Sequence, residues 1–353
     1  MIDNTKPYII GETAFHHQGD ICYLKNLIKA ASELKLDAIK LHLLFDISDY
    51  FVESHPAIEV INQWTFTKLQ WEEIIQYAYD FNLDLVLLCN DLASLEWVNA
   101  ECKTPIKAIE LHATGINDLF LLNSASQFAH TVILGIGGSK LDQIEVAIET
   151  LRKLGKTDIF LMYGFQSYPT DYNDINLSKI SLMKELFKLP VGYTDHTNPL
   201  DPYNEFISVS GILKGANVIE KHFTLDVNEK RIDSQSAVSI DQMKKIKELS
   251  SIMFATNGEG GLRMSEAELK YGDIGPMKKA IVARRNISLG SKIIMEDLAY
   301  KRTEQSSYLE QEDLLTLIGS KALINIDKDD IINFNNVQYN FKITETTQFL
   351  YNK

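Results

Sequence analysis

The segment NVIEKHFT (217–224) is the last of eight short runs in which apolar and β-branched residues follow one another almost without a break. Such runs are typical of parallel strands, because helices cover both faces of a parallel sheet. The other seven runs, in chain order, are PYIIGET (7–13), DAIKLHLL (37–44), LDLVLLC (83–89), IKAIELH (106–112), TVILGIG (131–137), DIFLMYG (158–164) and VGYTDHT (191–197). The sequence therefore predicts eight parallel strands.

Helical patterns lie between these runs, with apolar residues spaced three or four apart. They cover residues 21–36, 68–83, 139–155, 176–189 and 201–215. Eight strands, each followed by a helix, within about 250 residues predict an α/β fold of the (β/α)8 TIM-barrel type. The alternative is a doubly wound open sheet, which usually has fewer strands and often a GxGxxG turn near its start. The sequence contains no GxGxxG, so we favour the barrel.

The pattern changes after a last barrel helix expected at 241–255. The segments NGEGG (257–261) and YGDIGP (271–276) look like breaks, and the short strands and turn of 278–302 follow, with a helix-like stretch at 309–319. We predict a catalytic barrel over 1–256, a linker over 257–277 and a small α/β domain over 278–345.

Composition restricts the class of protein. In 353 residues, 45% are hydrophobic and 24% charged, which is ordinary for a soluble globular protein. The net charge of −13 argues against a nucleic-acid partner, since a phosphate backbone needs a basic surface. Three scattered cysteines do not form a disulfide framework or a cysteine zinc site. No signal peptide or membrane-spanning run is recognisable, so we expect a cytoplasmic protein with no membrane partner.

Polar residues cluster at the carboxyl ends of the predicted strands, where TIM barrels carry their chemistry. Buried Lys, Glu and His side chains are costly unless they are paired or bind a metal. The residues concerned are Glu12, Lys40, Asp195, His196, Glu220, Lys221 and His222, with Asp233 in the loop beyond.

Two of these residues, His196 and His222, end neighbouring strands and can approach each other. Two imidazoles with nearby carboxylates suit Mn, Zn, Fe or Co better than Mg, which prefers oxygen ligands. Either histidine alone is more simply a core residue, but the whole set at one end of a barrel favours a metal site. For His16 and His17 a solvated loop is an equally good interpretation. The remaining histidines have no supporting neighbours and are interpreted as structural: His42, His55, His112 and His130.

These motifs resemble those of the N-acetylneuraminate (sialic acid) synthase family over nearly the whole chain. The matching segments are GETAFHHQGD (11–20), DAIKLH (37–42), VGYTDHT (191–197) and ANVIEKHFTLD (216–226). The segment AIVARRNISLGSKIIMEDLAYKR (280–302) resembles the antifreeze-like (SAF) domain that ends these enzymes.

The resemblance implies a metal-dependent condensation of phosphoenolpyruvate with the aldehyde of an open-chain amino sugar, giving a nine-carbon 2-keto acid. A divalent metal, Mn or Mg or another transition metal, would bind His196 and His222 and polarise the aldehyde. The resemblance also implies a homodimer with exchanged tails, in which Arg302 of the Lys-Arg-Thr segment caps the partner's barrel. The remaining expected roles are catalytic for Glu12, Lys40, Glu220 and Asp233, and substrate-binding for Tyr168, Gln166 and Asp195.

Departures from the family pattern concentrate at the positions that bind the phosphate-carrying ligand, phosphoenolpyruvate, in the family. Glu110 and Ala113 stand where the family has Lys and Ser, and Gly135-Ile136-Gly137 replaces Ser-Thr-Gly. The third strand ends in LLCND (87–91) in place of Ser-Thr-Pro-Phe-Asp, GFQSYP (164–169) keeps only Tyr-Pro, and Ile232-Asp233-Ser234 replaces Pro-Asp-His. Replacing Lys by Glu changes the local charge by two units and opposes anion binding.

Three functions therefore stay open. We favour a synthase with a rebuilt phosphoenolpyruvate site. A metal-dependent aldolase or other C–C lyase with a different donor is the alternative of a second class. A non-catalytic sugar-binding relative is the third, and retention of the polar residues at the strand ends argues against it.

Overall fold

The computed structural model describes residues 6–165, 167, 170–258 and 260–339. Contacts between residues divide the chain into two compact units, Met1–Glu259 and Gly260–Lys353. Each unit has its own apolar core.

The first unit is a closed barrel of eight parallel strands, hydrogen-bonded in sequence order with β8 beside β1. The predicted (β/α)8 barrel is therefore confirmed. The strands are β1 (Tyr8–Glu12), β2 (Ala38–Leu43), β3 (Asp84–Cys89), β4 (Ala108–Leu111), β5 (Thr131–Gly135), β6 (Ile159–Tyr163), β7 (Val191–Asp195) and β8 (Val218–His222).

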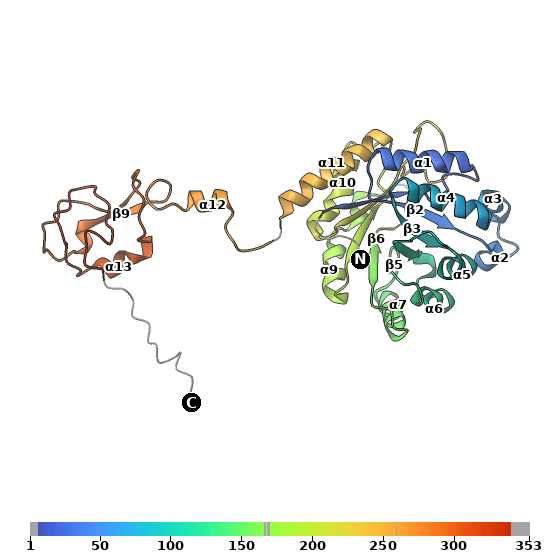
Figure 1. Cartoon of the computed structure of the whole chain (residues 1–353), viewed down its shortest axis with the longest axis horizontal. Helices are drawn as coiled ribbons and strands as arrows, with labels where there is room; N and C mark the ends of the chain where they lie inside the picture. Colours follow the sequence, from blue (N-terminus) through green and yellow to red (C-terminus); the bar gives the residue numbers. More distant parts are fainter. Residues whose placement is uncertain (1–5, 166, 168–169, 259, 340–353) are drawn as a thin grey trace, which may run out of the picture. The chain divides into compact units, whose positions relative to one another are not determined.

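Helices surround the strands and cover their outer faces (Figure 1). They are α1 (Ile21–Glu33), α2 (Ile47–Tyr50), α3 (Ile58–Trp64), α4 (Lys68–Asp80), α5 (Leu92–Ala100), α6 (Leu119–Ser126), α7 (Leu141–Lys153), α8 (Tyr172–Ile175), α9 (Ser178–Phe187), α10 (Asn204–Ser210) and α11 (Ile240–Asn257). Short 3-10 turns follow β4 (Ala113–Gly115) and α10 (Gly211–Lys214). The boundaries have local causes. For example, the Asp20 side chain accepts the Cys22 and Tyr23 amides at the start of α1, because the first amides of a helix have no partner within it.

The alternation of side chains along each strand separates two cores. One face of every strand packs against the helices in the large outer cluster. The other face fills the barrel interior with nine apolar side chains, namely Tyr8, Ile10, Ala38, Val86, Ala108, Ile133, Phe160, Met162 and Val218. Residues two positions further along the same strands continue this inward face, so Ile10 is followed by Glu12, and Val218 by Glu220. The barrel is thus apolar inside and becomes polar at its carboxyl end.

The second unit contains the antiparallel pair β9 (Ala280–Ala283) and β10 (Leu298–Lys301), with α12 (Glu266–Tyr271), α13 (Leu314–Leu317) and 3-10 turns at Met295–Asp297 and Gln311–Asp313. Helix α12 lies within the segment expected as a linker. The helix expected over 309–319 is shorter, since it consists of one 3-10 turn and α13. Among the described helices none is both long and apolar enough to cross a membrane.

Candidate active site

A pocket of about 360 Å³ opens at the carboxyl ends of the strands, and all eight strands contribute to its lining. Its strand residues include Glu12, Lys40, His42, Leu88, Glu110, Gly135, Met162, Thr194, Glu220 and His222. A larger cavity of about 890 Å³ lies at the opposite end, beside the amino ends of strands β5 to β8. TIM-barrel enzymes carry their chemistry at the carboxyl face, so the smaller pocket is the candidate site.

Lys40 lies at the centre of a buried cluster on the pocket floor. Its Nζ is 2.8 Å from Glu12 Oε2, 2.9 Å from Glu110 Oε2 and 2.8 Å from Glu220 Oε1. The strand register brings these residues together, because Glu12 pairs with Lys40 between β1 and β2. Each of the four side chains is at most 4% exposed. We call Lys40, Glu12, Glu110 and Glu220 the Lys40 cluster.

The Lys40 cluster places three carboxyl groups around one ammonium. Burial alone would lower the pKa of Lys40, but the three carboxylates outweigh it and hold that pKa well above its ordinary value. Burial raises the pKa of Glu12, yet Lys40 and His42 outweigh this and hold it well below its ordinary value. Burial and the neighbouring carboxylates raise the pKa of Glu110, and that of Glu220 well above its ordinary value. One ammonium is therefore shared by three carboxyl groups that do not ionise with equal ease.

Two histidines interpreted as structural also line this pocket. His42 follows Lys40 on the same face of β2, and its Nε2 lies 2.6 Å from Glu12 Oε1. His112 follows Glu110, and burial lowers its pKa to about 4, so the ring is neutral at pH 7. His42 and His112, interpreted as structural from the sequence, thus lie in the lining of the candidate pocket.

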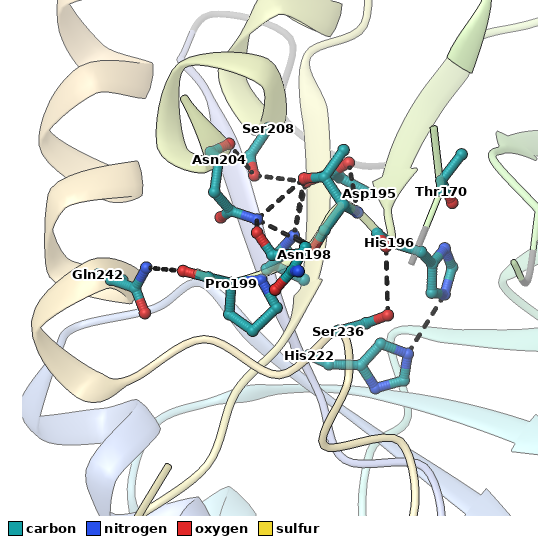
Figure 2. Close-up of polar contacts among 12 residues, drawn as sticks. Thr170, Asp195, His196, Asn198, Pro199, Asn204, Ser208, His222, Ser236 and Gln242 are labelled. Carbon is teal, nitrogen blue, oxygen red and sulfur yellow. Dashed lines mark hydrogen bonds and ion pairs between the residues drawn. The ribbon is translucent and has the colours of Figure 1, made fainter. Parts of the chain in front are cut away.

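His196 and His222 face each other across the ends of β7 and β8, with their Nε2 atoms 3.3 Å apart (Figure 2). Burial lowers the pKa of His196 to about 4 and that of His222 well below its ordinary value. Both rings are therefore neutral at pH 7, which is the form that binds metals.

The separation of the two Nε2 atoms fits a shared metal ion. Two nitrogens about 2.0–2.1 Å from one ion are about 2.8–3.4 Å apart at bond angles near 90–110°. Among the described residues, no group of three or more His, Cys, Asp or Glu side chains is arranged to hold a metal. A metal held by this pair would therefore leave several coordination positions for substrate or water, as in catalytic sites.

Asp195 differs from its expected role in substrate binding. Figure 2 shows Asp195 directed toward Ser208 and Asn204 of α10, whereas His196 is directed toward His222. Asp195 Oδ2 accepts from Lys221 Nζ at 2.6 Å and from the Ser208 hydroxyl at 2.7 Å, behind the strands. Side chains alternate along β7, so a residue adjacent to His196 faces the helices and not the pocket.

This outer network also holds the loop that carries His196. The Thr197 hydroxyl donates to Asp195 Oδ2 at 2.7 Å, and the Asn204 amide donates to the Thr197 carbonyl at 3.0 Å. On the other side of the loop, the Ser236 hydroxyl and the Thr170 amide donate to the His196 carbonyl (Figure 2). The His196 backbone is therefore fixed from two directions.

Of the other predicted site residues, two are described by the structure and two are not. Asp233 lies in the loop after β8 with φ of 62° and is not among the described lining residues of the pocket. Arg302 belongs to the second unit, where its Nε donates to the Pro276 carbonyl at 3.0 Å. Tyr168 and Gln166 lie outside the described residues.

The two histidines of the first βα loop are buried and not solvated. His16 and His17 are 2% and 1% exposed. His16 Nδ1 lies 2.6 Å from the Ile232 carbonyl, which ties this loop to the loop after β8. His17 stacks on Phe66, with ring centroids 4.7 Å apart.

One wall of the pocket is formed by glycine residues, which present backbone and no side chain. A Cβ at Gly137 would lie 1.9 Å from the Gly164 carbonyl oxygen, and one at Gly164 would lie 2.0 Å from the Thr194 oxygen. The ends of β5, β6 and β7 thus approach so closely that only glycine fits at these two positions. At Gly135 a Cβ would lie 3.5 Å from Glu110 Oε1.

An uncharacterised protein of Methanocaldococcus jannaschii is 29% identical, over 92% of this chain and 93% of its own length. N,N'-diacetyllegionaminic acid synthase of Campylobacter jejuni is 27% identical, over 93% of this chain and 99% of its own.

The solved structure of N-acetylneuraminic acid synthetase from Leptospira borgpetersenii superposes with a TM-score of 0.69 at 24% identity. It covers 76% of this chain and 90% of its own length, and at that identity it supports the fold alone. The model of the NeuB family matches residues 27–261, and this match ends before most of the second unit, so the antifreeze-like tail remains a prediction. Because the match spans more than half of the chain, including seven of the eight strands and both histidines of the facing pair, the protein belongs to the NeuB family.

Proposed function

We propose that this protein forms a carbon–carbon bond between a three-carbon enol donor and the aldehyde of an open-chain amino sugar, giving a nonulosonic acid. The observation that carries the proposal is the pair of neutral imidazoles, His196 and His222, facing each other beside the Lys40 cluster. Relatives that bear the names of nonulosonic acid synthases support the same class of reaction.

The metal would be held by His196 and His222, with Mn as the first ion to test and Mg or another transition metal as alternatives. A divalent ion supplies a Lewis acid for the aldehyde oxygen. The imidazole nitrogens fit Mn, Zn, Fe or Co better than Mg, because Mg prefers oxygen ligands.

The protein's own carboxylates position the acceptor. Glu12 pairs in register with His222, and its Oε1 accepts the Ala14 amide at 3.1 Å, which fixes the carboxylate. Glu220 Oε2 is buried and has no hydrogen-bond partner among the described residues. A buried acceptor without a partner is costly, and a sugar hydroxyl in the pocket would satisfy it. We therefore assign Glu12 and Glu220 to orienting the sugar.

The test of this function is product formation. Purified protein is incubated with Mn²⁺ and a panel of hexosamines, with phosphoenolpyruvate and pyruvate offered in separate reactions. We expect a new 2-oxo acid by mass spectrometry with one donor, lost when the metal is chelated. No product with any sugar and either donor would reject the proposal.

Exchange of tails between two copies remains part of the proposal, with Arg302 acting in the partner's pocket. A chain truncated near residue 275 is then expected to lose activity while its barrel still binds metal. Full activity of the truncated chain would exclude a role for Arg302.

A further inference from the structure

We propose that the donor taken by this pocket carries no phosphate and is a 2-oxo acid of the pyruvate type. This inference rests on the proposed carbon–carbon bond formation and specifies its donor. It follows from the charges and hydrogen-bond donors on the pocket floor.

The first argument is that Lys40 has no donor left for an anion. A lysine ammonium has three N–H bonds. Its Nζ lies within 2.9 Å of one oxygen each from Glu12, Glu110 and Glu220, so all three bonds are used. Binding a phosphate there would require displacing a buried carboxylate from its cation, and such a displaced charge is strongly unfavourable.

The second argument is that no other cation of the same chain replaces Lys40 in the described lining. Lys40 is the sole lysine or arginine among the described residues that line the pocket. His112 is neutral, because burial lowers its pKa to about 4. Phosphate binding depends on cations and clustered donors.

The third argument concerns hydroxyl and amide donors. The wall beside Glu110 includes Ala113, Gly135 and Gly137, which have no polar side chain, and the Thr114 hydroxyl in the same lining is paired with His112 Nδ1 at 2.8 Å. In the glycine loop after β5, the Ile136 and Ser139 amides already donate to backbone carbonyls. The dianion would instead meet the Glu110 carboxylate, whose repulsion is strong in a partly desolvated site.

A 2-oxo acid reaches the same carbon skeleton without phosphate. One C–H bond of the donor methyl group breaks, and its proton passes to a carboxylate of the Lys40 cluster. The methyl carbon forms a bond to the aldehyde carbon, and the resulting alkoxide oxygen takes the proton back. The product contains all atoms of both reactants, so no water is consumed and no oxidant is needed.

The experiment measures donor binding to the metal-free full-length protein by ligand-observed NMR, with pyruvate and phosphoenolpyruvate as probes. Metal-free protein is used because a bound metal would attract any anion. We expect phosphoenolpyruvate to bind at least about tenfold more weakly than pyruvate, since it carries the additional phosphate charge. Equal or tighter binding of phosphoenolpyruvate to the wild-type protein would overturn the inference.

A charge-neutral variant sharpens this comparison. Glu110→Gln keeps the shape of the side chain, and Lys40 keeps Glu12 and Glu220 as partners. We expect it to bind phosphoenolpyruvate at least about tenfold more tightly than wild type, because one opposing charge is removed. Glu145→Gln, on the exposed face of α7, is the matched control and should change neither affinity. An unchanged phosphoenolpyruvate affinity in Glu110→Gln would contradict the inference.

Measuring which donor gives product distinguishes a failure of this inference from a failure of the proposed function. A 2-oxo acid formed from pyruvate supports both. Product formed from phosphoenolpyruvate with release of phosphate supports the proposed function and overturns the donor inference. No product with either donor rejects the proposed function, and the order of the two binding constants still decides the donor question.

Discussion

Two buried lysines on opposite faces of the barrel wall have different electrostatic surroundings. Lys221 lies behind β8 and pairs with a single carboxylate, Asp195, at 2.6 Å. Lys40 lies inside the barrel and is shared by Glu12, Glu110 and Glu220. The Lys221–Asp195 pair is balanced in charge, whereas the Lys40 cluster has an excess of carboxyl groups.

The pKa values of the carboxyl groups differ between the Lys221–Asp195 pair and the Lys40 cluster. Burial lowers the pKa of Lys221 despite its partner, and Lys221 and the hydroxyl donors overcome burial to lower the pKa of Asp195. In the Lys40 cluster the pKa of Glu110 is raised instead. We infer that the balanced pair stabilises the fold, while the unbalanced cluster serves the pocket. Four predictions test this difference and the framework and metal ligands around it.

The largest effect is expected from breaking the balanced pair. Asp195→Ala leaves the fully buried Lys221 ammonium without its partner, which should lower the free energy of unfolding by about 3–5 kcal/mol. Urea denaturation followed by circular dichroism measures this loss. Asp241→Ala, at an exposed position in the first turn of α11, should cost under about 1 kcal/mol. Equal losses in the two variants would contradict a structural role for the pair.

Acid should weaken the framework through His17, which is buried against Phe66. Burial lowers its pKa to about 3 in the folded protein, so between that value and the unfolded value near 6.5 only the unfolded chain takes up a proton. Stability is thus complete above about pH 6.5 and falls on acidification, by about 2 kcal/mol from this group at pH 5.

Urea midpoints measured between pH 7.5 and 5 test this expectation. His17→Gln should reduce the pH dependence, while His130→Gln, at an exposed position, should retain it. A pH dependence that His17→Gln leaves unaltered would assign the acid sensitivity to other groups.

Metal binding should depend on the histidines that face each other. His222→Ala removes one of the two proposed ligands and is expected to weaken Mn²⁺ or Zn²⁺ binding at least about tenfold, which is about 1.4 kcal/mol. Isothermal titration calorimetry gives the affinities, with His130→Ala as the exposed control. Metal content that survives His222→Ala undiminished would exclude His222 as a necessary ligand.

The sequence was sufficient for the fold and for part of the site. Continuous apolar runs separated by helical patterns predicted the (β/α)8 barrel, and residues at strand ends pointed to Glu12, Lys40, His196 and His222. This succeeded because the position of a residue along a parallel strand determines its level in the barrel.

Side-chain direction was the signal that the sequence interpretation left unused. Residues two apart on a strand share a face, so His42 belongs with Lys40, and Asp195 cannot share the face of His196. The same rule places Lys221 behind the barrel, between Glu220 and His222. Applying this alternation would have found His42 and excluded Asp195.

The contact between Glu110 and Lys40 could not be found in this way. Strand β3 lies between their strands, β4 and β2, so the two side chains meet across the barrel interior and not along a sheet register. Sequence comparison marked Glu110 as a departure from the family. Its consequence for Lys40 became clear only from the three-dimensional arrangement.

The most direct test of the difference between the two lysines is a pair of amide substitutions, Asp195→Asn and Glu110→Gln, compared by free energy of unfolding at pH 7.5. The raised pKa of Glu110 means that the folded protein holds a proton more readily than the unfolded chain. The protonated Glu110 side chain therefore stabilises the folded protein at low pH, and this contribution is lost as pH rises through the pKa of Glu110 in the folded protein. A neutral Gln removes that loss, so Glu110→Gln should be more stable than wild type at pH 7.5, and the gain should disappear near pH 4.

Asp195 has a lowered pKa, so its ionised form stabilises the folded protein at neutral pH, and Asp195→Asn should lose stability there. We predict changes of opposite sign for the two variants at pH 7.5. A loss of stability of similar size in both would contradict the distinction between a balanced framework pair and an anion-rich pocket.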